Sequence, residues 1–137
     1  MANIILISCV SKKLNKKARA KDLYISPLFK FNLRYAKSLK PNKIFILSAK
    51  YGLLDLEKVV APYEKTLNKM KAKEIEKWAQ NVREKLKKVS NLEKDNFIFL
   101  AGERYRKYLV QHIKNSEVPL KGLGIGKQLK FLKDKTK

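Results

Sequence analysis

Three strand candidates limit the folds that this chain can adopt. They span residues 3–7, 43–47 and 96–100, and each consists of one polar residue followed by four large apolar ones. Apolar runs without polar alternation are typical of strands buried on both faces, as in a parallel sheet covered by helices. The sequence therefore predicts an α/β fold of three layers, α/β/α, around a small and mostly parallel sheet.

Each strand candidate runs directly into small or chemically reactive residues. The first is followed by Ser8-Cys9, the second by 48–52 (Ser-Ala-Lys-Tyr-Gly) and the third by 101–103 (Ala-Gly-Glu). In open parallel sheets, ligands bind just beyond the carboxyl ends of the strands. We therefore expect these segments to meet at one edge of the sheet and to form the functional site there.

The segments between the strand candidates predict helices. Ser26 and Pro27 have the residue types of an N-cap and a first helical position, so a helix should begin there and end before Pro41. An apolar stripe over 71–89 predicts the longest helix, with Trp78 in the core. The expected order continues with a helix over 103–114, a short edge strand over 117–120, a last helix after Lys127 and a frayed tail over 133–137. This succession is typical of one Rossmann-like domain over 1–137 with right-handed crossovers.

The chain carries an extreme positive charge. It has 33 lysines and arginines against 12 acids, which gives a formal net charge of +21. Such a field attracts polyanions, and nucleic acid (DNA or RNA) or a free nucleotide is the partner that we expect. A lysine-rich genome is the alternative source of the charge, although it usually raises glutamate together with lysine. The segment 12–21 holds six cations and no acid, and is either a solvated loop or an arm that contacts phosphates.

Other features narrow the classes of protein. A single cysteine permits neither an internal disulfide nor a cysteine-based metal site, and no metal or cofactor is expected. No apolar run approaches the roughly 20 residues of a membrane span, and no basic segment precedes the first strand as in a signal peptide. We therefore expect a cytoplasmic protein without membrane contact. The only histidine, His112, falls beside the apolar stripe of its helix, where a surface position is favoured over catalysis.

Ser8 and Cys9 are the first candidate site residues. Lys12 and Lys13 follow closely, and positive neighbours lower a thiol pKa and favour the thiolate, so Cys9 is a candidate nucleophile. The alternative is that Cys9 is a small core residue. Ser8 and Lys13 are candidates for substrate binding.

The segment after the second strand presents a hydroxyl, an ammonium and a phenol together, in Ser48, Lys50 and Tyr51. All three are candidate catalytic residues. Gly52 predicts a positive φ or a close approach of the backbone to a ligand, and is a candidate for substrate binding. The alternative is an ordinary tight turn with a surface lysine.

Two further groups of candidates complete the expected site. Glu57 is an acid in a basic region and would be a natural proton carrier in catalysis. The remaining candidates for substrate contact are Tyr24, Ser26, Tyr63, Gly102 and Tyr105.

A glycine-rich segment precedes the last helix, since residues 122–127 are Gly-Leu-Gly-Ile-Gly-Lys. Flexible backbone, a helix N-terminus and a lysine are the elements of a phosphate-binding turn, to which Gly122, Gly124, Gly126 and Lys127 would contribute. The spacing fits neither the P-loop nor the dinucleotide fingerprint. The alternative is a turn that lets the last helix pack closely.

Several strings together extend over nearly the whole chain, among them Ser8-Cys9 with Lys12-Lys13, 22–29 (Asp-Leu-Tyr-Ile-Ser-Pro-Leu-Phe) and 47–54 (Leu-Ser-Ala-Lys-Tyr-Gly-Leu-Leu). In combination they resemble a small family of bacterial, archaeal and phage proteins with no assigned reaction. The first loop is also similar to one in the uracil-DNA-glycosylase-like core of archaeosine synthase, and the Lys-Tyr-Gly-Leu-Leu turn to one in the DNA-associated YaaA peroxide-resistance proteins. These resemblances imply a uracil-DNA-glycosylase-like fold and a site directed at a nucleobase or a nucleic acid.

The expected function combines the charge with the strand-end residues. It is a nucleotide- or nucleobase-directed enzyme, independent of metal, that acts on a glycosidic bond or a base of a nucleotide or nucleic acid. Tyrosines would stack on the base, and Lys50 would stabilise an anionic leaving group. The alternatives are a non-catalytic basic nucleic-acid-binding protein, in which phosphate contacts supply the affinity, and a nucleotide-sensing or anti-defence module.

Overall fold

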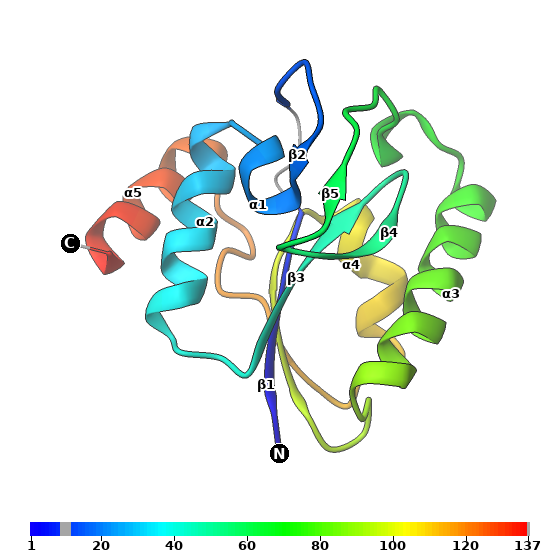
Figure 1. The fold of residues 1–137 in the computed structure, drawn as a ribbon. Coiled ribbons are helices and arrows are strands. Elements are labelled where there is room, and N and C mark those ends of the chain that lie inside the picture. The colour runs from blue at the N-terminus through cyan, green and yellow to red at the C-terminus, as the bar shows by residue number, and fades with distance from the viewer. Residues whose placement is uncertain (9–11, 137) are drawn as a thin grey trace.

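The computed structural model describes residues 1–8 and 12–136 and has a mixed five-stranded sheet at its centre (Figure 1). The strand order is β4-β3-β1-β6-β7. The parallel strands are β1 (Asn3–Ile7), β3 (Lys43–Ser48), β6 (Asn96–Leu100) and β7 (Asn115–Glu117), and β4 (Gly52–Asp55) runs antiparallel to β3. The predicted α/β fold with a mostly parallel sheet is confirmed.

The central strand β1 supplies side chains to two cores. Ile4 and Leu6 belong to one core, and Ile5 and Ile7 belong to the other, and all four are fully buried. Successive side chains of a strand point to opposite faces, so a strand covered on both faces needs apolar residues at every position. This is the physical origin of the unbroken apolar runs.

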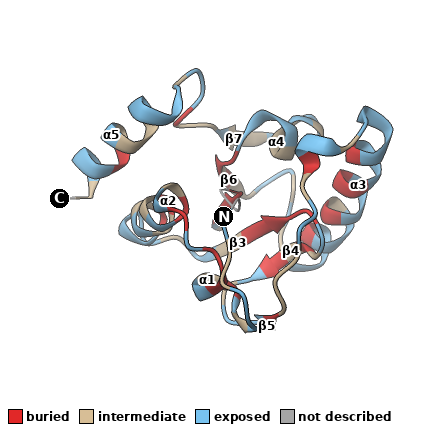
Figure 2. Cartoon of the chain, turned by 90° about the horizontal axis from the view of Figure 1, so that it is seen from above, coloured by how far each residue is buried: buried red, intermediate tan, exposed pale blue. Residues whose placement is uncertain are grey.

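Helices cover both faces of the sheet, which gives the predicted three layers. The core around Ile4 is completed by α3 (Ala72–Val89) and α4 (Glu103–Val110), and the core around Ile5 by α2 (Pro27–Ser38) and α5 (Ile125–Lys135). Figure 2 shows α2 and α5 on one side of the strands and α3 and α4 on the other. No helix in the described part of the chain is both long and apolar enough to cross a membrane.

Local sequence signals explain the helix ends. The Ser26 hydroxyl accepts a hydrogen bond from the amide of Phe29 at 3.2 Å, and Pro27 occupies the first helical position, as predicted. Trp78 is buried in the core, also as predicted, and its indole N–H donates to the carbonyl of Ser48 at 2.9 Å.

The structure corrects the expectation of a solvated loop over 12–21. This segment contains β2 (Ala18–Arg19), which pairs antiparallel with β5 (Val59–Val60), and it leads into the short helix α1 (Ala20–Leu23). Lys13 also forms an isolated antiparallel bridge with Tyr24. The pairing partner of β2 lies some 40 residues downstream, so the local sequence carries no sign of it.

Other boundaries also differ from expectation. Helix α4 ends at Val110, and β7 begins at Asn115, two residues before the expected edge strand. The tight turn expected at 50–52 belongs to a hairpin whose second strand is β4, and a short 3-10 helix, η1 (Leu67–Lys69), precedes α3. Helix α5 already begins at Ile125 and continues through Lys135, into the segment expected as a tail.

Candidate functional site

The carboxyl ends of β3, β1 and β6 lie side by side at one edge of the sheet, which we call the rim. At the rim the ends of β1 and β6 are joined through Ser8. Its amide donates to the carbonyl of Leu100, and its hydroxyl accepts from the amide of Gly102, both at 3.2 Å. Ser8 is buried, so its hydroxyl holds the turn after β6 in place.

Three hydroxyl groups form a connected cluster at the end of β3, which we call the hydroxyl cluster: Tyr24, Ser48 and Tyr63. The Ser48 hydroxyl donates to the Tyr63 hydroxyl at 2.8 Å, and the hydroxyls of Tyr63 and Tyr24 are hydrogen-bonded at 2.9 Å. Ser48 is fully buried and Tyr24 almost so. The cluster thus joins β3 to two segments far apart in sequence.

Lys13 lies against this cluster. Its ammonium nitrogen is 4.4 Å from the centre of the Tyr63 ring, within the range of a cation–π contact. Burial lowers the pKa of the Lys13 amine below its usual range, and the negative charge of Glu64 partly opposes this shift. Perturbed pKa values cluster at functional sites, so this position makes Lys13 a candidate functional residue.

The two phenols of the hydroxyl cluster are held neutral. Burial raises the pKa of Tyr63 well above its usual range, and the neighbouring Tyr24 adds to the shift. Burial also raises the pKa of Tyr24, although the hydrogen bonds from Tyr63 and Ser48 oppose it. At neutral pH both groups are therefore hydroxyl donors and not phenolates.

The turn after Ser48 is shaped by its own hydrogen bonds. The Tyr51 amide donates to the Ser48 hydroxyl at 3.0 Å, and the Tyr51 hydroxyl donates to the carbonyl of Ala61 at 3.0 Å. The Tyr51 and Tyr63 rings meet edge to face, with their centres 5.5 Å apart. Gly52 has a φ of +70°, which confirms the predicted positive φ.

A cavity of about 210 Å³ opens beside the carboxyl end of β6, and we call it the rim cavity. It is lined by Leu100, Ala101, Gly102, Glu103, Arg106, Leu120, Lys121, Gly122, Leu123 and Gln128. The Arg106 guanidinium donates to the carbonyl of Ala101 at 2.8 Å, which fixes its position at the wall. Among the described residues, the cavity thus combines the cations Arg106 and Lys121 with exposed glycine backbone and the carboxylate of Glu103.

A family model matches residues 4–134, which is nearly the whole chain. The chain belongs to DUF6884, a family of unknown function. Comparison with curated proteins and with solved structures finds no match. Membership of DUF6884 therefore assigns no chemistry to the chain.

In this DUF6884 protein the structure brings together part of the expected site. Ser8 and Gly102 are in contact, and Lys13 and Tyr51 lie against the hydroxyl cluster. The Tyr105 ring packs edge to face on Trp78, 5.6 Å between centres, and lies close enough to raise the pKa of both Tyr24 and Tyr63 slightly. Cys9 lies outside the described residues.

Other expected residues lie elsewhere or have structural roles. Ser26 caps α2. Lys50 is exposed, with its ammonium 5.3 Å from the centre of the Tyr51 ring. Glu57 follows β4, which runs away from the rim, and its carboxylate pairs with Lys21 at 3.0 Å and Arg19 at 3.5 Å. The hydrogen bond from Lys21 lowers the Glu57 pKa, so this side chain is an ionised surface group.

The expected phosphate-binding turn is divided by the start of α5. Gly122 lines the rim cavity, and Gly124 is the N-cap of α5. Gly126 and Lys127 lie in the first turn of that helix and are exposed. In the described part of the chain, no group of three or more His, Cys, Asp or Glu side chains is placed to hold a metal ion.

The rim cavity also contains functional candidates that the sequence analysis missed. Arg106 and Lys121 come from different segments, one in α4 and one in the turn before α5. The sequence does carry one signal for Arg106, because it lies four residues after Gly102, one turn into the helix that follows β6. Lys121 is one lysine among many and could not have been singled out.

Proposed function

We propose that the protein binds a nucleotide, either free or within a nucleic acid, at the rim and acts on its glycosidic bond or base. The proposal is carried by one observation: the cationic rim cavity and the hydroxyl cluster with Lys13 lie at the same edge of one sheet. In open α/β sheets this edge is where ligands bind.

The rim cavity supports the phosphate part of the proposal. Arg106 and Lys121 supply positive charge, and an arginine fork suits the geometry of a phosphate. The volume of about 210 Å³ is below the roughly 300–1,000 Å³ of complete ligand pockets, so it suits a phosphate or a phosphoribosyl group. The rest of the nucleotide would extend along the rim.

The hydroxyl cluster supports the base part of the proposal. Neutral phenols donate hydrogen bonds without charge repulsion, and a departing or reacting base gains negative charge that such donors stabilise. Lys13 takes the role that the sequence analysis gave to Lys50, because its ammonium lies against Tyr63 whereas Lys50 is exposed. Lys13 would stabilise the same developing charge.

A second candidate function is a non-catalytic nucleic-acid-binding protein. The observation that favours it is the charge, since 21 positive charges would remain even if all 12 acids were paired with cations. Phosphate contacts would then supply most of the affinity. A nucleotide sensor, the remaining alternative, would bind its ligand at the same rim without catalysing a reaction.

Calorimetric titration over a series of salt concentrations separates these candidates. A rim site should bind a mononucleotide saturably with a shallow salt dependence, and Lys121→Gln should weaken that binding severalfold. The matched control is Lys107→Gln, which removes an equal charge from an exposed position on α4. For an oligonucleotide, each phosphate contact adds about 0.7–0.9 to the slope of log affinity against log salt. Steep oligonucleotide binding without mononucleotide binding would contradict a rim site and favour the second candidate.

If mononucleotides bind, incubation with nucleosides, nucleotides and oligonucleotides followed by chromatography of the released base tests the reaction. Tyr63→Phe should retain binding and lose turnover, because the phosphate contacts remain while a hydroxyl of the cluster is removed. Binding without any base release or base modification would leave the sensor as the supported function.

A further inference from the structure

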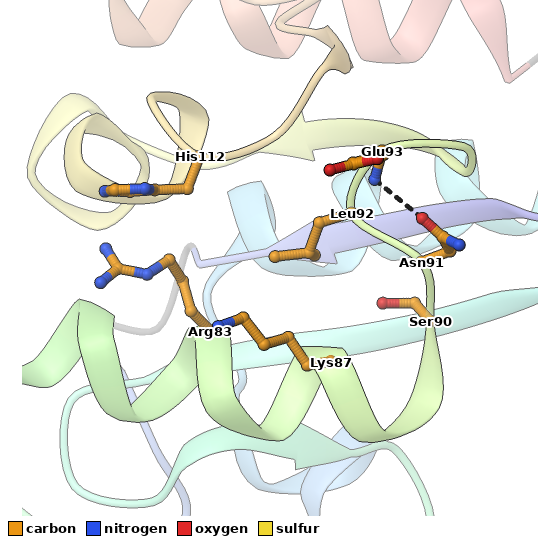
Figure 3. Close-up of a pocket in the computed structure, with 7 residues that line it drawn as sticks. All are labelled: Arg83, Lys87, Ser90, Asn91, Leu92, Glu93 and His112. Atoms are coloured by element: carbon orange, nitrogen blue, oxygen red, sulfur yellow. Dashed lines mark hydrogen bonds between the residues drawn. The ribbon is translucent and has the colours of Figure 1, made fainter.

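A groove of about 510 Å³ lies at the opposite end of β6 from the rim cavity, and we call it the α3 groove (Figure 3). One wall is the C-terminal half of α3, with Arg83 and Lys87 one helical turn apart. The opposite wall is His112, just after α4. Figure 3 shows Leu92 pointing into the space between the two walls. Among the residues that the structure describes, the groove and the rim cavity share no lining residue.

The floor of the α3 groove is fixed by hydrogen bonds. The Asn91 side chain accepts from the amides of Glu93 at 2.9 Å and Lys94 at 3.1 Å. The carboxylate of Asp95 accepts from the amides of Asn91 at 2.8 Å and Ala2 at 2.9 Å, which joins this segment to the start of β1. A site whose backbone is already ordered loses little conformational entropy when it binds a ligand.

Nitrogen-bearing side chains surround the α3 groove. Arg83 is half-buried, and its guanidinium donates to the carbonyl of Tyr108 at 3.3 Å, which holds it between α3 and α4 with further N–H donors available. Lys87 pairs with Glu84 at 3.2 Å, but an exposed pair of this kind is weak and leaves the amine able to turn toward a ligand. The imidazole of His112 completes the set, and Glu93 is the one acid among the described lining residues.

We propose that the α3 groove binds a small phosphomonoester, separately from any ligand at the rim. Arg83 and Lys87 contact the phosphate from one wall and His112 from the other. The volume of about 510 Å³ far exceeds a phosphate ion and falls within the roughly 300–1,000 Å³ of small-molecule pockets. Leu92 offers an apolar surface to the body of the ligand, and Glu93 accepts hydrogen bonds from hydroxyl groups on it. The expected ligand is therefore a hydroxyl-bearing phosphomonoester, such as a sugar phosphate or a mononucleotide.

The single histidine of the chain provides a direct test. Proton NMR at fixed pH and ionic strength follows the imidazole signals of His112 during titration with inorganic phosphate, ribose 5-phosphate or adenosine 5′-monophosphate. We expect saturable shifts with both phosphomonoesters, at lower concentration than with inorganic phosphate. The two phosphomonoesters distinguish a sugar phosphate from a nucleotide as the preferred ligand. Shifts that do not saturate, or that are equally strong with inorganic phosphate alone, would overturn the proposal.

Matched variants separate a local site from the general positive field. Lys87→Gln should weaken phosphomonoester binding about tenfold, the effect of one charge-assisted hydrogen bond, and Arg83→Gln with Lys87→Gln about a hundredfold. The control is Lys73→Gln with Lys77→Gln, which removes the same charge at the same spacing from exposed positions earlier in α3. Equal weakening by the control pair would contradict the proposal. Lys87 is exposed, so Lys87→Gln alone keeps the test valid if the Arg83 variant is unstable.

The same titration separates this proposal from the proposed function of the rim. Lys121→Gln removes a cation from the rim cavity and should leave the His112 titration unchanged. Loss of nucleotide binding at the rim with an intact His112 response would leave the α3 groove proposal standing. Loss of the His112 response in Lys121→Gln would overturn the claim that the two sites are separate.

Discussion

Strand β6 connects two regions of opposite character. The segment before it forms the floor of the α3 groove, and the residues after it line the rim cavity. Near the rim, the polar side chains of Ser8, Ser48 and Tyr24 are buried and bonded within the protein. In the α3 groove, Lys87 and His112 are exposed and carry their nitrogen atoms at the surface.

This difference indicates how each region responds to mutation. A polar group that is bonded inside the protein contributes to folding, and its loss leaves a buried partner without a hydrogen bond. A polar group at the surface contributes little to folding and remains available to a ligand. We therefore expect changes in the buried hydroxyl cluster to alter stability, and changes at the exposed Lys87 and His112 to alter affinity alone.

The largest expected effect is that of Tyr63→Phe on stability. The variant removes the hydroxyl that is bonded to both Ser48 and Tyr24, and we expect the free energy of unfolding to fall by about 1–3 kcal/mol. Lys87→Gln in the α3 groove should change it by less than about 0.5 kcal/mol. Urea denaturation measures both, and equal losses would break the contrast between the two regions.

Two glycines provide the next test. Gly52→Ala forces a side chain into a φ of +70° beside the hydroxyl cluster, and should cost about 1–2 kcal/mol of the free energy of unfolding. Gly126→Ala lies in the exposed first turn of α5 and should stabilise the protein by about 0.5–1 kcal/mol, because alanine is the better helix former. Thermal unfolding monitored by circular dichroism shows whether each variant raises or lowers the melting temperature. A higher melting temperature for Gly52→Ala would contradict the positive φ at this position.

Alkaline pH should destabilise the protein through the buried phenols of the hydroxyl cluster. The pKa values of Tyr24 and Tyr63 are raised by burial, so above about pH 10 the unfolded chain loses phenol protons that the folded chain retains, and stability falls with pH. The lowered pKa of Lys13 acts in the opposite direction. The folded chain then binds fewer protons than the unfolded one between this lowered pKa and about 10.4, so stability rises with pH there.

Variants identify the residue that causes each change of stability with pH. Tyr63→Phe should show a shallower decline above about pH 10, and Lys13→Met should lack the preceding rise. Lys87→Gln, in the α3 groove, should show the same dependence of stability on pH as the wild type. That result would sharpen the contrast between the hydroxyl cluster and the groove. An unchanged decline in Tyr63→Phe would show that other groups control alkaline unfolding.

The smallest expected effect is that of Glu57→Gln. Its carboxylate pairs with Lys21 and Arg19 at the surface, where such pairs are screened by salt. We expect little change in the melting temperature at moderate salt and no change in ligand binding at the rim. A marked loss of binding would restore Glu57 as a functional residue.

The sheet could be predicted from the sequence because its signals are local. Each parallel strand of the centre is a short apolar run, and the helix beginning at Pro27 carries its own cap. The small β2–β5 sheet could not be predicted, because its strands of two residues each owe their form to a distant partner. Strand β4 was also missed, because the residues after Ser48 were interpreted as a tight turn and not as the start of a hairpin.

The candidate site was predictable only in part. Strand ends pointed to Ser8, Ser48 and Gly102, since topology alone brings the ends of parallel strands to one edge. Residue type could not show that Lys13 faces Tyr63 whereas Lys50 is exposed, because both follow a strand in a basic region. The cations of the rim cavity and the α3 groove come from helix faces and turns, where the abundance of lysine hides any single one.

The β2–β5 pairing has a consequence for motion. It joins residues 18–21, which follow β1, to residues 56–60, which follow β4. The amides of Ala20 and Lys21 add hydrogen bonds to the carbonyls of Lys58 and Leu56, at 2.8 and 3.0 Å. We therefore expect residues 18–21 and 56–60 to open as one cooperative unit, so that their amides exchange with deuterium together. An insertion or deletion within one of these paired segments should therefore disrupt the hydrogen bonds of the other as well.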